Sequence, residues 1–250
     1  MFLSIIIPAF NEGAKIAKDI ETTVNFLRGR PYTSELLIVD DGSRDDTFQR
    51  AEAAARTLSA ETVSVRVLNY GGNRGKGFAT RHGIQHAGGE VIGFMDSGLC
   101  VPLRFIEVAV SEIQKGYDFT IASRRLAGTK ITKAQPLYRR AGSKVFWYLM
   151  RGAMGVQATD TQCGFKFYSR KAAHEIYSEL FTDGFMFDIE ALLLAKKKGL
   201  KGSEFAVEWA NDADSRYHPV KGTIKNFREL ARIRYRLVFG PIAPSKGESQ

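Results

Sequence analysis

The chain has 250 residues, of which 44% are hydrophobic and 25% are charged, and its formal net charge at pH 7 is +9. These values are ordinary for a globular protein with a full core. Cys100 and Cys163 form neither a disulfide framework nor a zinc-binding pattern, so we expect a reducing, cytosolic compartment. The positive charge favours a polyanionic partner, which can be nucleic acid, an anionic membrane or a phosphorylated substrate.

The sequence says more about two of these possible partners, nucleic acid and the membrane. The chain lacks a helix-turn-helix, zinc-finger or RNA-binding signature, so we do not expect it to bind nucleic acid. Its N-terminus runs into Phe2–Ile7 without a basic leader, and no apolar run approaches the roughly 20 residues that cross a bilayer. We therefore expect a soluble or peripheral protein.

The first half of the chain alternates strand-like and helix-like segments. This alternation predicts βαβ units and a mostly parallel, buried sheet, which is an α/β fold. The predicted strands are rich in β-branched and aromatic residues: Phe2–Pro8, Glu35–Asp40, Val63–Leu68, Glu90–Asp96 and Tyr117–Ala122. Helical patterns between them include Ala14–Leu27 and Asp46–Leu58.

The order of elements changes from Pro136 onward. We predict a helix over Leu137–Met154, a strand near Phe165–Tyr168, two further helices, a strand over Gly202–Trp209 and a basic helix that closes the chain.

Polar clusters follow the first two predicted strands, at the edge where an open parallel sheet binds ligands. Pro8, Phe10 and Glu12 lie at the end of the first strand, where a nucleobase can lie against the Phe10 ring. The alternative is that this segment begins a helix, with Asn11 as the N-cap residue and Glu12 complementing the helix dipole. The paired acids Asp40 and Asp41 end the second strand. They suit hydrogen bonds to a base and a ribose, or alternatively a simple turn.

The segment from Gly71 to Gly77 is glycine-rich, but its spacing fits neither the phosphate loop nor the dinucleotide fingerprint. It predicts a cationic loop that opens a helix, with Lys76 and Arg81 able to meet phosphate oxygens. His82 and His86 are spaced i and i+4 without the acidic residue of HExxH. We predict them to be ordinary helix residues.

Two further clusters carry carboxylates. Asp96 ends the fourth predicted strand, where it can hold a divalent cation that neutralises a diphosphate leaving group. The segment Asp160-Thr-Gln-Cys-Gly-Phe-Lys166 places a carboxylate, an amide, a tight turn and a cation within seven residues.

Together these motifs resemble the inverting family 2 glycosyltransferases with the GT-A fold, and in particular the dolichyl-phosphate glucosyltransferases and bacterial polyprenyl-phosphate glycosyltransferases. The likeness covers roughly residues 2–212, and it rests on the blocks Pro8-Ala-Phe-Asn-Glu12, Val39-Asp-Asp-Gly-Ser43, Gly75-Lys-Gly77, Asp96, Asp160-Thr-Gln-Cys-Gly-Phe-Lys166 and Phe187-Asp-Ile-Glu190. It implies a GT-A domain over residues 1–220, which we expect to be followed by a basic amphipathic helix at 221–240 and a disordered tail at 241–250.

The resemblance also implies the ligands. The donor is a nucleotide-diphosphate sugar, with UDP-glucose favoured and GDP-mannose as the alternative, and the cofactor is Mg²⁺ or Mn²⁺. The acceptor is a polyprenyl or dolichyl phosphate at the cytoplasmic face of the membrane. The family's metal motif is usually Asp-x-Asp, whereas this chain has Asp96 and Gly98, so Asp96 alone is the expected metal ligand. A loose match to a later Gly-Ser-Lys motif assigns closure over the diphosphate to Arg216.

On the acceptor side, Arg124 follows the fifth strand, and Arg139 and Ser143 share one face of the helix predicted over Leu137–Met154. Two guanidiniums and a hydroxyl suit a phosphate, and the resemblance to polyprenyl-phosphate mannosyltransferases implies that they hold the acceptor phosphate. The alternative is a solvated basic face.

The expected mechanism depends on the acceptor. A phosphate monoester carries its own nucleophilic oxygen and needs no strong base. Asp160 and Gln162 would then bind sugar hydroxyls or orient the acceptor, whereas with a hydroxyl acceptor Asp160 would be the base. A transferase acting on a soluble or polymer-bound hydroxyl and a non-catalytic nucleotide-sugar-binding protein remain the alternatives.

The closing run from Ile224 to Phe239 places apolar residues near one helical face, with arginines flanking them. This pattern suits an interfacial anchor on anionic lipid, which we expect to give peripheral membrane contact. Packing of the same face on the domain is the alternative.

Overall fold

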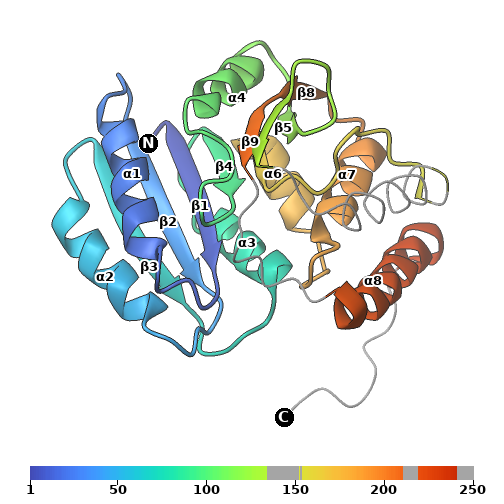
Figure 1. The fold of residues 1–250 in the computed structure, drawn as a ribbon. Helices are drawn as coiled ribbons and strands as arrows, with labels where there is room; N and C mark the ends of the chain where they lie inside the picture. Colours follow the sequence, from blue (N-terminus) through green and yellow to red (C-terminus); the bar gives the residue numbers. More distant parts are fainter. Residues whose placement is uncertain (134–151, 153, 211–218, 241–250) are drawn as a thin grey trace. The chain divides into compact units, whose positions relative to one another are not determined.

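The computed structural model describes residues 1–133, 152, 154–210 and 219–240 (Figure 1). The chain divides into two compact units, Met1–Ser215 and Arg216–Gln250. The first contains a seven-stranded sheet of order β3-β2-β1-β4-β7-β5-β8. The described part of the second contains the helix α8 (Pro219–Phe239). The predicted tail at 241–250 and most of the predicted helix at 137–154 lie outside the described residues.

Strands and helices alternate from Leu3 to Ser123, as the sequence predicts for the first half of the chain, and the order changes after that. The strands are β1 (Leu3–Ala9), β2 (Ser34–Asp40), β3 (Val63–Asn69), β4 (Val91–Met95), β5 (Phe119–Ser123), β6 (Lys130–Lys133), β7 (Phe165–Ser169), β8 (Gly202–Ala206) and β9 (Glu208–Ala210). The helices are α1 (Ile16–Arg28), α2 (Thr47–Leu58), α3 (Lys76–Gln85), α4 (Phe105–Gln114), α6 (Arg170–Tyr177) and α7 (Phe187–Lys197).

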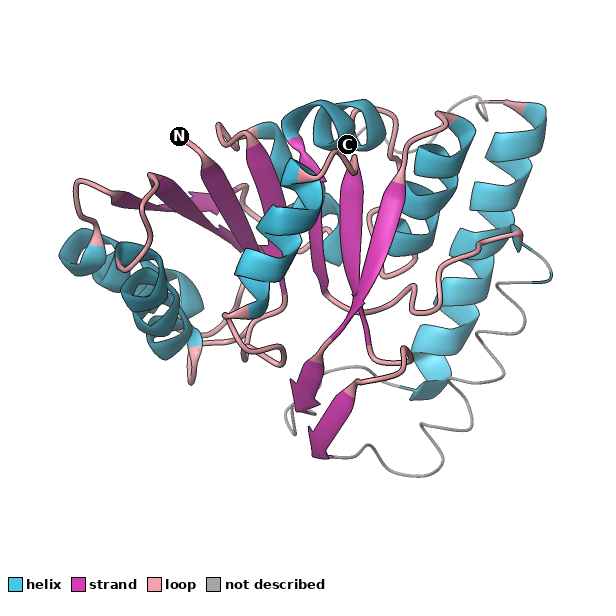
Figure 2. Ribbon diagram, turned by 90° about the horizontal axis from the view of Figure 1, so that it is seen from above, coloured by secondary structure: helices cyan, strands magenta, loops and turns pink. Residues whose placement is uncertain are grey.

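The central strands are continuous apolar runs because helices cover both faces of the sheet (Figure 2). Apolar residues of α1, α2 and α4 form one core cluster with the face of β1 that carries Ile5 and Ile7. On the other face, Gly83 of α3 packs against Ile6, and the rings of Phe94 and Phe187 lie 5.6 Å apart. The predicted α/β fold with a mostly parallel sheet is confirmed.

Pro8 lies inside β1, although proline lacks the amide hydrogen that a ladder uses. The position of Pro8 near the end of β1 explains why a proline is tolerated in this strand. The pairing of β1 with β4 ends at Ile6 and Phe94, so beyond that point β1 is paired with β2 alone.

Two features of the sheet differ from a simple reading of the sequence. β7 runs antiparallel to both of its neighbours, β4 and β5. The predicted strand Gly202–Trp209 is two strands, because β8 joins the main sheet while β9 pairs with β6 in a separate ribbon. The direction of β7 matters for the site, since the loop that precedes β7 meets the carboxyl ends of β4 and β5 at one edge.

A buried ion pair joins β7 to the helix α7. The ammonium of Lys166 lies 2.6 Å from Asp188 Oδ1 and also donates to the Cys163 carbonyl at 2.7 Å. Lys166 is fully buried and Asp188 is 2% exposed. Neither charge has access to bulk water, so Lys166 depends on Asp188 for compensation, and Asp188 is compensated by Lys166 with a smaller contribution from Lys76.

We expect Lys166→Met to lower the free energy of unfolding by about 3 to 5 kcal/mol, because it leaves the Asp188 carboxylate buried without the cation that it contacts. Urea unfolding measures this loss. Lys171→Met, which removes an 81% exposed lysine paired with Glu175, is the matched control and should have little effect. Equal stability of the two variants would contradict this account of the pair.

Candidate active site

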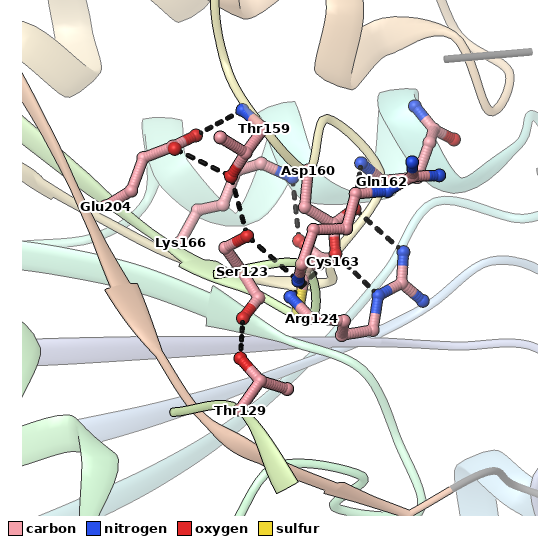
Figure 3. A network of polar contacts seen from close by, with 10 residues as sticks. Ser123, Arg124, Thr129, Thr159, Asp160, Gln162, Cys163, Lys166 and Glu204 are labelled. Carbon is pink, nitrogen blue, oxygen red and sulfur yellow. Dashed lines mark hydrogen bonds and ion pairs between the residues drawn. The ribbon is translucent and has the colours of Figure 1, made fainter. Parts of the chain in front are cut away.

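The loop before β7 is held at the sheet edge by an ion pair between Asp160 and Arg124 (Figure 3). Arg124 Nε and Nη2 donate to the two carboxylate oxygens at 2.6 and 2.9 Å, and the Arg124 amide donates to Oδ2 at 3.0 Å. Asp160 is 3% exposed, whereas the Arg124 side chain is 22% exposed. The pair uses Nε and Nη2, so the other amino group, Nη1, lies outside it.

This pairing fixes the protonation state of Asp160. Burial raises the pKa of a carboxyl group, but the charge of Arg124 and its hydrogen bonds outweigh that effect and lower the pKa of Asp160 to about 2. A carboxylate with this pKa has little tendency to accept a proton at pH 7. The arrangement therefore suits orientation of Arg124 better than general-base catalysis.

A second hydrogen-bond network fixes the start of the same loop. Glu204 on β8 accepts from the amide and the hydroxyl of Thr159, both at 2.7 Å. The Thr159 hydroxyl also bonds to the Ser123 hydroxyl at 2.7 Å, and the Thr129 hydroxyl donates to the Ser123 carbonyl at 2.9 Å (Figure 3). Sequence reasoning missed Glu204, because its partner lies 45 residues away and no motif links them.

Gln162 lies in the middle of the loop, and its backbone amide donates to Asp160 Oδ1 at 3.2 Å. Its side-chain nitrogen Nε2 is buried and has no hydrogen-bond partner within the described part of the chain. A buried donor without a partner is costly. The geometry therefore fits a ligand oxygen at this position.

Asp96 directly follows β4 and contacts Lys76, the first residue of α3. Lys76 Nζ lies 2.5 Å from Asp96 Oδ1. Burial lowers the pKa of Lys76, but the charges of Asp96 and Asp188 outweigh burial and raise it, so the ammonium stays charged at neutral pH. The structure thus brings two predicted donor-site residues together, a carboxylate and a permanent cation.

Whether the site can bind a divalent metal depends on the Asp96 carboxylate. The Asp96 side chain is 39% exposed, and the described residues contain no cluster of three His, Cys, Asp or Glu side chains. Mg²⁺ can be held by one carboxylate together with substrate phosphates and water. The donor set therefore fits a cation shared with a diphosphate, but not one enclosed by protein ligands alone.

Gly98 occupies the place of the family's second metal-motif aspartate. Its φ is +81°, and its amide donates to Asp19 Oδ2 at 2.7 Å. A side chain at this φ is strained, so the backbone conformation explains glycine here.

Asp40, the last residue of β2, and Asp41, which follows it, are buried and hydrogen-bonded by neighbouring loops. Asp41 accepts from the Tyr70 hydroxyl at 2.7 Å, from the Arg74 amide at 2.7 Å and from the Gly75 amide at 2.9 Å. Asp40 accepts from Asn69 Nδ2 at 2.9 Å. These carboxylates build the loop that carries Lys76, and this role was not foreseen from the sequence.

The loop after β1 is fixed in a similar way. Asn11 has a φ of +54°, and its side-chain oxygen accepts from the Arg44 amide at 2.8 Å, so it does not cap the following helix as the alternative reading supposed. Glu12 forms an ion pair with Lys15 at 2.9 Å. Phe10 is half-buried beside them.

The other residues predicted to bind phosphate are either paired within the protein or lie outside the described residues. Arg81 pairs with Asp183 at 2.5 Å and donates to the Leu180 carbonyl, so it is committed to the fold. The amides of Gly77 and Phe78 donate to the Asp183 carbonyl, which occupies the start of α3. Arg139, Ser143 and Arg216 lie outside the described residues.

The fold and this cluster of residues define a GT-A glycosyltransferase. Residues 4–177 match the family described as Glycosyl transferase family 2. The chain belongs to this family.

Relatives and solved structures agree with this membership. The chain is 30% identical to the dolichyl-phosphate beta-glucosyltransferase of Saccharomyces cerevisiae over 260 residues, covering 96% of this chain and 76% of the yeast protein. The same identity holds over 249 residues with the Drosophila melanogaster dolichyl-phosphate beta-glucosyltransferase, covering 95% and 76%. The fold resembles that of glucosyl-3-phosphoglycerate synthase of Mycobacterium tuberculosis, which was crystallised with Mn²⁺, UDP and phosphoglyceric acid. The TM-score is 0.69 and the sequence identity is 19%, over 97% of this chain and 80% of the mycobacterial chain.

We expect Asp160→Asn to lower the free energy of unfolding at pH 7 by about 3 kcal/mol, because it leaves Arg124 without its anion. The pKa of Asp160 is lower in the folded chain than in the unfolded chain. The stability that Asp160 contributes is therefore fully present above about pH 4 and is lost as the pH falls towards 2. Urea unfolding at several pH values measures the difference between the two proteins.

The gap between wild type and Asp160→Asn should narrow between pH 4 and pH 2. Asp46→Asn, which removes a 54% exposed partner of Arg50, is the control and should change little at any pH. A gap that does not depend on pH would contradict the assignment of a low pKa to Asp160.

Proposed function

We propose that the chain transfers glucose from UDP-glucose to a dolichyl or other polyprenyl phosphate, with inversion at the anomeric carbon. The observation that carries this proposal is the Arg124–Asp160 pair. It presents a guanidinium at the sheet edge and keeps the neighbouring carboxylate from acting as a base. An acceptor that already bears a phosphate needs a cation and no base, which is the chemistry this pair offers. The names of the yeast and fly relatives support the same sugar and acceptor.

On this proposal, an oxygen of the acceptor phosphate attacks the anomeric carbon as the bond to the diphosphate oxygen breaks. Arg124 orients the acceptor phosphate through Nη1, with Arg139 and Ser143 as further ligands. Lys76 neutralises charge that develops on the departing diphosphate, and Arg216 closes over it. Gln162 binds a sugar hydroxyl or the acceptor through Nε2. The principal contributions are alignment and charge stabilisation.

For the nucleoside, we propose the end of β1 and the loop that follows it, with Pro8, Phe10 and Glu12, and the acids Asp40 and Asp41 at the end of β2. Phe10 offers a ring to the base. The two acids act by holding the surrounding loops, since their carboxylates already accept protein hydrogen bonds. We further propose that Asp96 holds Mg²⁺ or Mn²⁺ together with the diphosphate. When bound, the metal would supply charge neutralisation of the leaving group.

We also propose that residues 221–240 form a membrane-contact segment that follows a catalytic domain of residues 1–220 in the sequence, and that this contact lies at the cytoplasmic face. On α8, Leu230 and Ile233 of the predicted apolar face are buried, whereas the apolar residues Phe227, Tyr235, Val238 and Phe239 are exposed. Exposed arginines lie between them: Arg228, Arg232 and Arg234. Among the described residues, no helix has the length and apolar character of a membrane span. Surface binding would bring the enzyme to a lipid acceptor.

A transfer assay with a short polyprenyl phosphate tests the function. With UDP-glucose and Mg²⁺ or Mn²⁺ we expect a glucosyl lipid, and Arg124→Lys should lower kcat/KM for the lipid by roughly tenfold or more, since an ammonium cannot reproduce the bidentate pair. UDP-glucose affinity should stay the same. Arg50→Lys, on the surface of α2, is the control.

Two outcomes would contradict the proposal. Transfer to a sugar hydroxyl but not to the lipid phosphate would favour a soluble or polymer acceptor. UDP-glucose binding without transfer to any acceptor would favour a non-catalytic binding protein.

Vesicle sedimentation tests the membrane contact. Replacing Arg228, Arg232 and Arg234 by Gln should weaken binding to vesicles that contain anionic lipid by roughly 100-fold, at about 1 kcal/mol for each charge near the surface. Replacing Arg50 and Arg56 of α2 by Gln is the control, because these arginines are exposed on another helix. If the loss of binding for each removed charge is the same in the two sets, the contribution of α8 is only net charge, and the proposed anchor is wrong.

A further inference from the structure

Gly164 lies in the loop before β7, directly against Asp96. The Asp96 amide donates to the Gly164 carbonyl at 3.0 Å, at the point where Met95 of β4 pairs with Phe165 of β7. A Cβ on Gly164 would overlap Cγ and both oxygens of the Asp96 carboxyl group. The Asp96 carboxylate thus occupies the space that any side chain at position 164 would need.

The backbone does not require glycine at this position. Gly164 is not among the residues with positive φ, in contrast to Gly98, so an alanine can adopt its conformation without strain. Glycine is required at position 164 because the Asp96 carboxyl group occupies the space that a Cβ atom would need. The overlapping atoms are the end of a side chain, and a side chain can rotate away more cheaply than a backbone can move.

The carboxylate seated on Gly164 lies between two parts of the site. On one side Lys76 Nζ contacts Asp96 Oδ1 at 2.5 Å. On the other side Gly164 belongs to the loop that carries Asp160, the partner of Arg124. A shift of the Asp96 carboxylate therefore breaks its contact with Lys76, whereas the hydrogen bonds of the Arg124 guanidinium go to Asp160 and not to Asp96.

We propose that Gly164 is a positioning residue for donor binding, which seats the Asp96 carboxylate against Lys76 by leaving room for it. This inference rests on the proposed function, in which Asp96 and Lys76 serve the diphosphate. It also explains why a glycine belongs in the Asp-Thr-Gln-Cys-Gly-Phe-Lys segment at this position.

Calorimetric titration of UDP, with Mg²⁺ present, tests the proposal on the full chain. We expect Gly164→Ala to weaken UDP binding by roughly tenfold or more, with a Tm close to that of wild type because the carboxylate can rotate away. Gly29→Ala is the matched control, since a Cβ there meets only ordinary contacts at the end of α1. If Gly164→Ala binds UDP as wild type does, the proposal is wrong.

A double-mutant cycle separates positioning from general damage. If Gly164→Ala acts through the Asp96 carboxylate, it should weaken UDP binding no further in an Asp96→Ala background. Any loss of Tm caused by Gly164→Ala should also disappear there, because the alanine then fills vacated space. Additive losses in affinity and Tm would overturn the proposal.

The same cycle distinguishes this inference from the proposed function. Failure of glucosyl transfer to a lipid phosphate would leave the UDP titrations and the Tm values interpretable. If wild type did not bind UDP at all, the donor assignment would fail, and the positioning role in donor binding would fail with it.

Discussion

The bidentate ion pair between Asp160 and Arg124 is the interaction on which the rest of the site depends. It fixes the loop before β7 against the end of β5, and it keeps the Asp160 carboxylate ionised. It also orients one guanidinium edge away from the carboxylate. A buried pair of this kind contributes little net stability on its own, but removing one partner leaves an uncompensated charge. In this site the main contribution of the pair is to orient the Arg124 guanidinium.

The direction of β7 makes this interaction possible. Because β7 runs antiparallel between β4 and β5, its first residues lie at the carboxyl ends of both neighbours. Asp96 after β4, Arg124 after β5 and Asp160 before β7 therefore meet at one edge. Parallel strands alone would place the start of β7 at the opposite edge of the sheet. One reversed strand thus joins the proposed donor side of the site to its proposed acceptor side.

Much of the fold could be predicted from the sequence. The continuous apolar runs of β1 and β2 indicate strands buried on both faces, and the alternation with helices indicates a parallel sheet. The direction of β7 could not be predicted, since periodicity reports which face a residue occupies and not which way a strand runs. The break between β8 and β9 was missed for a related reason, because strand pairing depends on distant partners.

The positions of the candidate site residues in the fold were easier to predict than their contacts. Asp96 and Asp160 lie at the expected sheet edge, and Lys76 lies beside Asp96. Asp41 holds a loop through its hydrogen bonds, and Arg81 is paired with Asp183; in both cases the partners are far away in sequence. Glu204 carried no motif at all. These contacts are consequences of tertiary packing, which sequence spacing does not encode.

The central claim is that the site orients an acceptor that supplies its own anionic nucleophile. The most direct measurement is the pH dependence of kcat/KM for lipid acceptors whose phosphate or phosphonate groups have different pKa values. We predict that the rate rises as each acceptor loses its second proton, near pH 6 for a phosphate monoester, and that the inflection moves with the pKa of the acceptor. An inflection that stays at the same pH for every acceptor would show that a group on the enzyme acts as the base, and it would contradict this account.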